Sequence, residues 1–278
     1  MTQPSALSPK PGLVVAKAAK AIEVRDLSVR FGARTASPVL AVDRVSFSLE
    51  AGEFVSLVGP SGCGKTTILN LLTGLLPEQP EGDVRVLDKH PHPGNPDIAY
   101  MLARDSLLPW RTALGNAAYG MEIRDVPKAV REERARDLLH RVGLGDFVDS
   151  YPKALSHGMR QRCALARTFA LDSPVFLMDE PFGALDAQTK LQLEDVLMDL
   201  WSATQRTVVF VTHDLAEAVA LSDRVIVMGA RPGRIIADVP IDLPRPRHVR
   251  ALQKNPRFHA LYAQLWSLLE QGMSHADR

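Results

Sequence analysis

The sequence predicts an α/β domain with a parallel β-sheet at its centre. Helical segments separate three short apolar runs, and this alternation of strand and helix favours a parallel sheet. A further apolar run opens into a glycine-rich turn followed by a helix, the arrangement that a phosphate-binding loop requires. The three runs are Val175 to Met178, Thr207 to Val211 and Arg224 to Met228, and the run before the turn is Phe54 to Val58. The chain has 278 residues, enough for one large domain of this class with a helical insertion.

The N-terminal part predicts an antiparallel β subdomain. Apolar residues alternate from Ile22 to Phe31 with one slip in phase, which indicates a strand with a kink or bulge. Val39 to Leu49 is expected to pair antiparallel with it and to end at the turn 51–53. The first 20 residues have no sustained apolar core and no convincing cleavage site, so we expect a flexible tail over 1–20.

Two further regions predict helices. Helical periodicity runs from Lys65 to Leu76. Residues from about 100 to 165 lack strand-like runs and include the charged stretch Pro127 to Val142, whose proline suits a first helical turn, so we expect an inserted helical subdomain. In the C-terminal segment, 251–278, one apolar helical face predicts a helix packed on the core, made by Phe258, Leu261, Tyr262, Leu265, Leu268 and Leu269.

Composition limits the class of protein. Apolar residues make up 46% and charged residues 23%, and the formal net charge is +1, so nothing favours bulk attraction to nucleic acid or to anionic membranes. No apolar run approaches the ~20 residues of a membrane-spanning helix. The two cysteines, Cys63 and Cys163, suggest a reducing compartment without a disulfide framework. We therefore expect a cytoplasmic protein that could still dock onto a membrane partner.

A phosphate-binding loop follows the run Phe54 to Val58. Its sequence fits G-x-x-x-x-G-K-[ST], in which glycines let backbone N–H groups turn inward and form an anion site at a helix N-terminus. Lys65 is expected to reach the β- and γ-phosphates, and the Thr66 hydroxyl to bind Mg²⁺. Cys63 is expected to be small rather than reactive. The predicted nucleotide-binding residues here are Gly59, Pro60, Ser61, Gly62, Cys63, Gly64, Lys65, Thr66 and Thr67.

Two adjacent acids end the apolar run Val175 to Met178. Because the run is expected to be a buried parallel strand, Asp179 should lie at its carboxyl end beside the phosphate loop. We expect Asp179 to bind Mg²⁺ and Glu180 to polarise the attacking water. The loop and the acidic pair together are typical of P-loop nucleotide hydrolases.

Four further segments resemble ABC ATPases, over roughly residues 22–245. Leu155 to Arg162, with the sequence LSHGMRQR, resembles their signature loop, and Pro181 to Asp186 resembles their D-loop. His213, in the sequence Val-Thr-His-Asp, resembles their switch histidine. Phe31 resembles the aromatic residue that stacks on adenine in this family, although an ordinary core phenylalanine remains the alternative.

The resemblance implies an ATP- and Mg²⁺-dependent ATPase that dimerises around two nucleotides. Lys65, Glu180 and His213 would be catalytic, with His213 contacting the γ-phosphate and orienting the water beside Glu180. Ser156 can cap the following helix and form a second anion site, which in this family faces the γ-phosphate held by the other protomer. The residues that would act on the partner's nucleotide are Ser156, His157, Gly158, Met159 and Asp186.

The sequence departs from the family pattern at two positions. Ala103 stands where the Q-loop usually has a glutamine, and an alanine cannot make that residue's polar contacts. His157 stands where the signature usually has glycine, and its side chain could either crowd the partner's phosphate or add a donor. Both departures predict altered efficiency or coupling rather than loss of nucleotide.

The stretch Ser106 to Thr112 resembles importers of nitrate, taurine, aliphatic sulfonates and pyrimidine-type thiamine precursors, as does the tail from Arg231 to Arg247. Leu107, Leu108 and Trp110 would contact a membrane subunit, or else pack locally. The implied partners are a second copy or a paralogous ATPase subunit, two permease subunits and an extracytoplasmic solute-binding protein, with no nucleic acid. The implied location is the cytoplasmic face of the plasma membrane.

The expected organisation is a nucleotide-binding domain over 21–250 followed by a C-terminal helix and tail over 251–278. Two alternatives stay open. One is a degenerate or regulatory subunit that binds ATP and hydrolyses it weakly, which Ala103 and His157 would suit. The other is a soluble ABC ATPase acting on nucleic acid or the ribosome, but neither a second cassette nor a long coiled-coil insert is present to support it.

Overall fold

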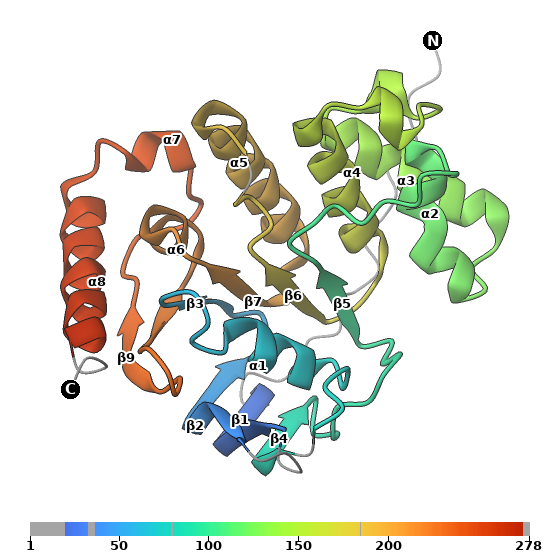
Figure 1. The fold of residues 1–278 in the computed structure, drawn as a ribbon. Helices are drawn as coiled ribbons and strands as arrows, with labels where there is room; N and C mark the ends of the chain where they lie inside the picture. Colours follow the sequence, from blue (N-terminus) through green and yellow to red (C-terminus); the bar gives the residue numbers. More distant parts are fainter. Residues whose placement is uncertain (1–19, 33–36, 79, 184, 275–278) are drawn as a thin grey trace.

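The computed structural model describes residues 20–32, 37–78, 80–183 and 185–274. A six-stranded sheet runs through the centre, a smaller antiparallel sheet lies below it in the view of Figure 1, and helices cover the opposite side. The helices of the inserted region gather into a separate group at the upper right of Figure 1. The α/β architecture, the antiparallel subdomain and the helical insertion are as the sequence predicts. The expected tail 1–20 lies outside the described residues, except that Lys20 already belongs to a strand.

The central sheet has the strand order β5-β6-β7-β3-β8-β9. All neighbouring pairs are parallel except β8 and β9, which are antiparallel. The sequence predicts four of these strands but not β5 or β9. The strands are β3 (Phe54–Val58), β5 (Ile98–Met101), β6 (Val175–Asp179), β7 (Thr207–Thr212), β8 (Arg224–Met228) and β9 (Ile235–Pro240).

The antiparallel sheet has the order β2-β1-β4, formed by β1 (Lys20–Phe31), β2 (Val39–Glu50) and β4 (Glu81–Val86). The slip in the apolar alternation of β1 is a bulge: the register with β2 shifts between Val24 and Leu27. Asp26, within that bulge, has a φ of 46°. The bulge is a predicted feature that the structure confirms. β4 was not predicted, because its exposed glutamate and glycine break the apolar pattern.

The helices differ from expectation mainly at their ends. The first ends at Leu72 rather than Leu76, because Gly74 adopts a left-handed φ of 72°. The helical group begins at Ala113 and not near 100. The helices are α1 (Lys65–Leu72), α2 (Ala113–Ile123), α3 (Lys128–Arg141), α4 (His157–Ala170), α5 (Ala187–Thr204), α6 (Leu215–Leu221), α7 (Val249–Leu252) and α8 (Pro256–Ser274), with 3₁₀ turns at Gly145–Phe147 and Pro152–Ala154.

Two hydrophobic cores lie on opposite faces of the central sheet. Along each central strand, alternate side chains face one core or the other, as the two-residue period of a strand requires. One core packs against the helices and contains the aromatic contacts of Phe54 with Trp201 and with Phe210, whose ring centroids are 5.7 and 5.8 Å apart. The other joins the sheet to α1 and to the antiparallel subdomain. The antiparallel subdomain is thereby held against the phosphate-binding edge.

The C-terminal helix α8 packs on the core through Phe258, Leu261 and Leu265, which are buried as expected. Tyr262 was assigned to the same face, and that assignment is wrong. Its side chain is exposed and stacks on Trp266, with 6.4 Å between the ring centroids. The apolar stripe of α8 is therefore narrower than its periodicity indicates.

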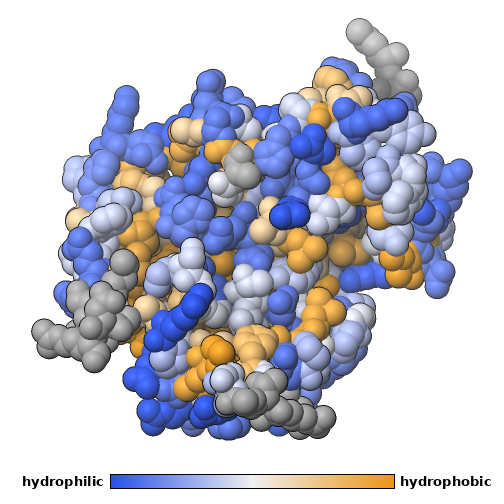
Figure 2. Space-filling view, viewed as in Figure 1, coloured by the Kyte–Doolittle hydropathy of each residue, from blue (hydrophilic) through white to orange (hydrophobic). Residues whose placement is uncertain are grey.

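The surface is hydrophilic with separate apolar patches, one of them over the outer part of the helical group (Figure 2). Exposed apolar side chains of that group include Ile123 and Val130. Within the described ranges, no helix combines the length and the apolar character needed to cross a bilayer.

A buried arginine joins α6 to the segment after β9. The Arg247 side chain is 6% exposed, and its guanidinium donates to the carbonyl oxygens of Ser222 (2.6 Å) and Leu243 (2.9 Å), with longer bonds to the carbonyls of Val219, Ala220 and Ile241. Burial lowers the pKa of Arg247 to about 10, with Arg245 adding to the effect. Arg247 thus satisfies carbonyls at the C-terminal end of α6.

A second buried group of charges joins α5 to α6. Lys190 pairs with Asp214 and with Glu217, each at 2.6 Å. Asp214 also caps α6, and Glu217 accepts a hydrogen bond from Thr212. Burial first, and then the charge of Glu217, raises the pKa of Glu194 in this group from its ordinary 4.5 to about 8. Thr212 and Asp214, which take part in these contacts, are the residues on either side of His213 in the chain.

We predict that Arg247→Met lowers the free energy of unfolding by on the order of 1–3 kcal/mol, because buried carbonyls lose their donor. Urea denaturation measures the change. The control is Arg257→Met, whose partner Asp242 is largely exposed, so solvent screens the pair and its loss should cost clearly less than the loss of Arg247. Equal effects of the two substitutions would contradict the role given to Arg247.

We predict that Glu194→Gln stabilises the fold increasingly between pH 5 and pH 8. The folded chain keeps the Glu194 proton up to about pH 8, whereas the unfolded chain loses it near 4.5, so this residue costs stability as the pH rises through that window. The gain at pH 8 relative to pH 5 should be on the order of 1–3 kcal/mol. Urea midpoints at several pH values measure it, with the exposed Glu133→Gln as control. A gain independent of pH would contradict the interpretation.

Candidate functional site

The phosphate loop follows β3 at the middle of the central sheet. Gly62 and Gly64 have φ values of 78° and 96°, a region that residues with a side chain rarely adopt. A Cβ atom on Gly64 would lie 2.6 Å from a methyl group of Val42 in β2. The loop is therefore pressed against the antiparallel subdomain, and α1 begins directly after it with its N-terminal N–H groups toward the loop's concave side.

Lys65 folds back over the same loop. Its side chain is 6% exposed, and Nζ donates to the carbonyl oxygens of Gly59 (2.8 Å) and Pro60 (3.1 Å). The neighbouring Cys63 is buried, and burial raises the pKa of its thiol, an effect that the charge of Lys65 opposes. A buried, protonated thiol agrees with the expectation that Cys63 is small rather than reactive.

Thr66 and Asp179 are in contact, although β3, which leads to Thr66, and β6, which ends at Asp179, are not neighbouring strands. β7 lies between β3 and β6 in the sheet, and α1 extends across its end to contact β6. The Thr66 hydroxyl donates to the Asp179 carboxylate, with oxygen–oxygen distances of 3.0 and 3.2 Å. Burial raises the pKa of Asp179, and Glu180 adds to the rise, while Thr66 and Lys65 oppose it. A hydroxyl beside a carboxylate is a donor set that fits Mg²⁺.

Glu180 turns toward the phosphate loop because of its backbone. Consecutive side chains of a regular strand point to opposite faces of the sheet. Glu180 follows the last residue of β6, and its left-handed φ of 45° departs from the strand conformation and so redirects its side chain. Its N–H still donates to the carbonyl of Val211 at 2.9 Å. Its carboxylate lies 3.0 Å from Nδ1 of His213, which follows β7. Glu180 and His213, two of the three predicted catalytic residues, follow neighbouring parallel strands and are thus in direct contact.

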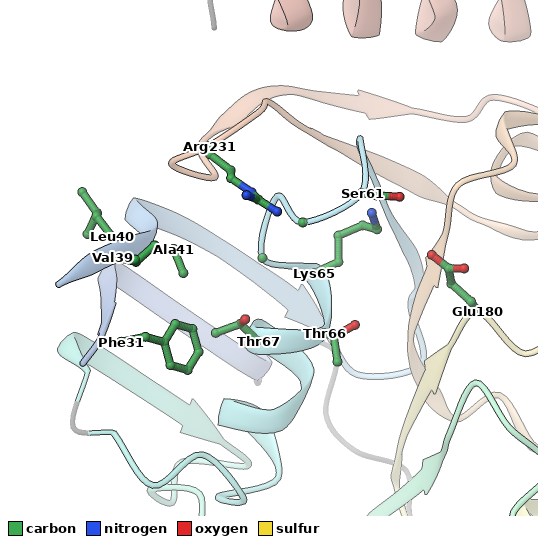
Figure 3. Close-up of a pocket in the computed structure, with 12 residues that line it drawn as sticks. Phe31, Val39, Leu40, Ala41, Ser61, Lys65, Thr66, Thr67, Glu180 and Arg231 are labelled. Carbon is green, nitrogen blue, oxygen red and sulfur yellow. The ribbon is translucent and has the colours of Figure 1, made fainter. Parts of the chain in front are cut away.

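An open pocket of about 430 Å³ is lined by the phosphate loop and by Glu180 (Figure 3). This volume lies within the roughly 300–1,000 Å³ typical of small-ligand sites. Its predicted lining residues are Phe31, Ser61, Gly62, Gly64, Lys65, Thr66, Thr67 and Glu180. Asp179 and His213 are not among its lining residues, but they contact the lining residues Thr66 and Glu180. Phe31 lines the pocket rather than the centre of a core, which favours the adenine-stacking role over the alternative. The pocket therefore fits an aromatic base at one end and a phosphate chain at the other.

Sequence reasoning missed four lining residues. Val39, Leu40 and Ala41 form an apolar wall at the start of β2, and Arg231 reaches in from the turn between β8 and β9 (Figure 3). The run Arg231-Pro-Gly was noticed only as a likeness to a subfamily. No local pattern could place residue 231 beside residue 62, because the contact joins segments far apart in the chain.

The predicted signature residues do not line this pocket. Ser156 caps α4 as expected, and its side chain accepts a hydrogen bond from the backbone N–H of Met159 at 3.2 Å. His157 folds back along α4, where its Nδ1 lies 3.4 Å from a guanidinium nitrogen of Arg160. Gly158 packs against Thr189 of α5. The N-terminus of α4 is therefore separate from the pocket that the phosphate loop lines.

Asp186 caps the next helix. Its carboxylate accepts from the N–H groups of Gln188 (3.1 Å) and Thr189 (3.0 Å) at the start of α5. Hydrogen bonding with Thr189 holds the pKa of Asp186 below its ordinary value, so the carboxylate stays ionised. Asp186 is exposed and, like the signature residues, lies outside the pocket lining.

Ala103 is exposed in the segment between β5 and α2. That segment is tied to the helical group by two arginines of α4. Arg160 pairs with Asp105 at 2.8 Å, and Arg167 donates to the backbone carbonyls of Asp105 and Ser106, each at 2.8 Å. The Q-loop region is therefore attached to the signature helix even though a glutamine is missing from position 103.

The profile of the ABC transporter family matches residues 42–183. An ATP-binding protein of Brucella abortus (strain 2308) is 45% identical over 240 residues, which cover 86% of this chain and 91% of that protein. The taurine import ATP-binding protein TauB of Rhizobium johnstonii is 38% identical over 252 residues, which cover 89% of this chain and 96% of that protein.

A solved structure also matches. The ATP-binding cassette MJ0796, in a dimeric post-hydrolysis state bound to ADP and Pi, aligns with a TM-score of 0.70 and 28% identity. The match covers 80% of this chain and 100% of that one.

Proposed function

The chain belongs to the family of ABC transporter ATP-binding proteins, and from that premise we propose that two copies form paired ATP sites. The chain is an ATPase and the ATP-binding subunit of a transporter. In the proposed dimer, each nucleotide lies between the phosphate loop of one copy and the α4 N-terminus of the other. One observation carries the proposal: five residues lie together at the edge of the sheet that holds the phosphate loop. They are Lys65, Thr66, Asp179, Glu180 and His213.

Each residue has a role that follows from its contacts. Lys65 and the loop N–H groups bind the phosphate chain. Thr66 and Asp179 would hold Mg²⁺, which neutralises charge on the phosphate oxygens when bound. Glu180 accepts a proton from the attacking water, and His213, hydrogen-bonded to the same carboxylate, keeps it oriented. Phe31 stacks on the adenine, at the pocket end formed by β1 and β2.

The signature residues support the dimeric arrangement. Ser156, His157, Gly158, Met159 and Asp186 lie outside the pocket lining, so they complete a site only when a second copy presents them. The similarity to a cassette solved as a dimer supports the same arrangement. The side chain of His157 turns back toward Arg160, which leaves the α4 N-terminus accessible to the partner's γ-phosphate.

Membrane partners follow from the transporter role. We infer two permease subunits and an extracytoplasmic solute-binding protein, with this chain on the cytoplasmic face of the membrane. Trp110 is 70% exposed, and it follows the partly buried Leu107 and Leu108 in the segment after Ala103. This exposed aromatic residue favours docking onto a permease over local packing. The similarity to a taurine import protein makes taurine or a related sulfonate the proposed solute class.

One alternative rests on specific residues. Ala103 removes a polar Q-loop contact and His157 replaces a signature glycine, so a subunit that binds ATP and hydrolyses it weakly is the second candidate. A paralogous subunit would then supply the competent site. Turnover by the purified chain separates the two candidates.

We predict that Glu180→Gln lowers Mg²⁺-dependent ATP turnover by about 100-fold or more while ATP binding persists, because the amide cannot accept the proton. Phosphate release and equilibrium binding measure the two properties. Glu133→Gln, on the surface of α3, should match the parent chain. Equal turnover in parent and Glu180→Gln would contradict the role of Glu180. ATP binding without turnover in either would favour the regulatory subunit.

We predict that cells lacking this chain lose uptake of labelled taurine, and that the intact chain restores it whereas Glu180→Gln does not. Failure of the variant to restore uptake would tie transport to hydrolysis. Uptake of nitrate serves as the comparison within the same cells. Loss of nitrate uptake with intact taurine uptake would contradict the proposed solute class.

A further inference from the structure

We propose that Arg231 is a second cation of the nucleotide site, which binds the phosphate chain of ATP beyond its α-phosphate. The inference rests on the nucleotide site proposed above. Arg231 belongs to the turn between β8 and β9 and lines the same pocket as Lys65 (Figure 3). A Cβ atom on Gly62 would lie 2.6 Å from Nη2 of Arg231 and 3.0 Å from its Nε. The guanidinium therefore lies against the phosphate loop at Gly62.

Among the residues that the structure describes, none makes a hydrogen bond or an ion pair with the guanidinium of Arg231. By contrast, the nearby Arg224 pairs with Glu53 and Asp238, and the nearby Arg234 pairs with Asp43. Arginine has five N–H donors in a planar fork, the geometry that matches phosphate oxygens. An unpaired fork that borders a phosphate pocket is therefore available to an anionic ligand.

The turn that carries Arg231 is held in place by its neighbours. The N–H of Gly233 donates to the carbonyl of Ala41, and the carbonyl of Gly233 accepts from the N–H of Asp43, each at 2.9 Å. The N–H of Gly229 donates to the carbonyl of Arg234, also at 2.9 Å. These bonds attach the turn to β2, which forms the apolar wall of the pocket. Arg231 thus approaches the ligand from a fixed backbone, which reduces the ordering cost of binding.

Charge around the pocket supports phosphate rather than another anion. Lys65 and Arg231 both line the pocket: Nζ of Lys65 lies on the carbonyl oxygens of Gly59 and Pro60, and the guanidinium of Arg231 lies against Gly62. A chain of two or three phosphates is long enough to contact both cations, whereas a single phosphate next to the ribose is not expected to reach the second. The guanidinium is expected to contact oxygens of the phosphates that ATP and ADP share.

The test compares nucleotide affinities in the Glu180→Gln background, where hydrolysis does not interfere. With Arg231→Gln, the Kd for ATP and for ADP should rise about ten-fold, the loss expected for one charge-assisted hydrogen bond. Arg231→Lys should recover part of that loss, because it keeps the charge without the fork. Arg234→Gln is the matched control: it lies in the same turn and outside the pocket lining, and its ATP affinity should stay within two-fold of the parent.

Three outcomes would overturn the proposal. One is an unchanged ATP Kd in Arg231→Gln. Another is an equal loss in Arg234→Gln, which would assign the effect to the shape of the turn. The third is an equal loss in Arg231→Lys and Arg231→Gln together with a lower thermal midpoint in the absence of nucleotide, which would indicate damage to the fold. If the parent chain itself binds no ATP, the proposed function fails first, so the two failures are distinguishable.

Discussion

The tight packing around the phosphate loop is the constraint on which the other parts of the site depend. Its glycines face different neighbours: Gly59 meets Met228 at the end of β8, Gly64 meets Val42 in β2, and Gly62 meets the side chain of Arg231. A side chain at any of them would push apart the central sheet, the antiparallel subdomain or the β8–β9 turn. The inward-facing N–H groups, the start of α1 and the position of Thr66 beside Asp179 all follow from this fit.

The sequence anticipated the elements whose chemistry is local, and it missed those defined by distant contacts. The glycine pattern, the acids after a buried strand and the histidine after another can be recognised within a few residues. β9 was missed because only Val239 of that strand is buried, so its apolar pattern is weak. Arg231 and Arg247 lie in a tail that was noticed only as a family likeness, because nothing near them in the chain indicates a carbonyl cluster or a phosphate loop. Tyr262 was misplaced because helical periodicity does not reveal how wide a buried stripe is.

The residues proposed for hydrolysis and those proposed to bind the partner's nucleotide lie on different elements. The hydrolytic residues follow strands of the central sheet, whereas the signature residues open a helix of the inserted group. Arg160 and Arg167 connect that helix to the segment that includes Asp105 and follows Ala103. If nucleotide binds at the α4 N-terminus as proposed, movement of that helix would be transmitted to the segment after Ala103 through an ion pair and backbone hydrogen bonds. This link gives the chain a mechanical connection that does not require a glutamine at position 103.

The central position of β3 has a consequence for how the chain becomes functional during synthesis. In the central sheet β3 pairs with β7 and β8, whose residues are made about 150 or more positions later. The turn that carries Gly233 and covers the loop comes later still. A nascent chain that ends before residue 207 therefore has the whole phosphate-loop motif but lacks β7, β8 and the turn that carries Gly233. We therefore expect the nucleotide pocket to form only after most of the domain has been synthesised.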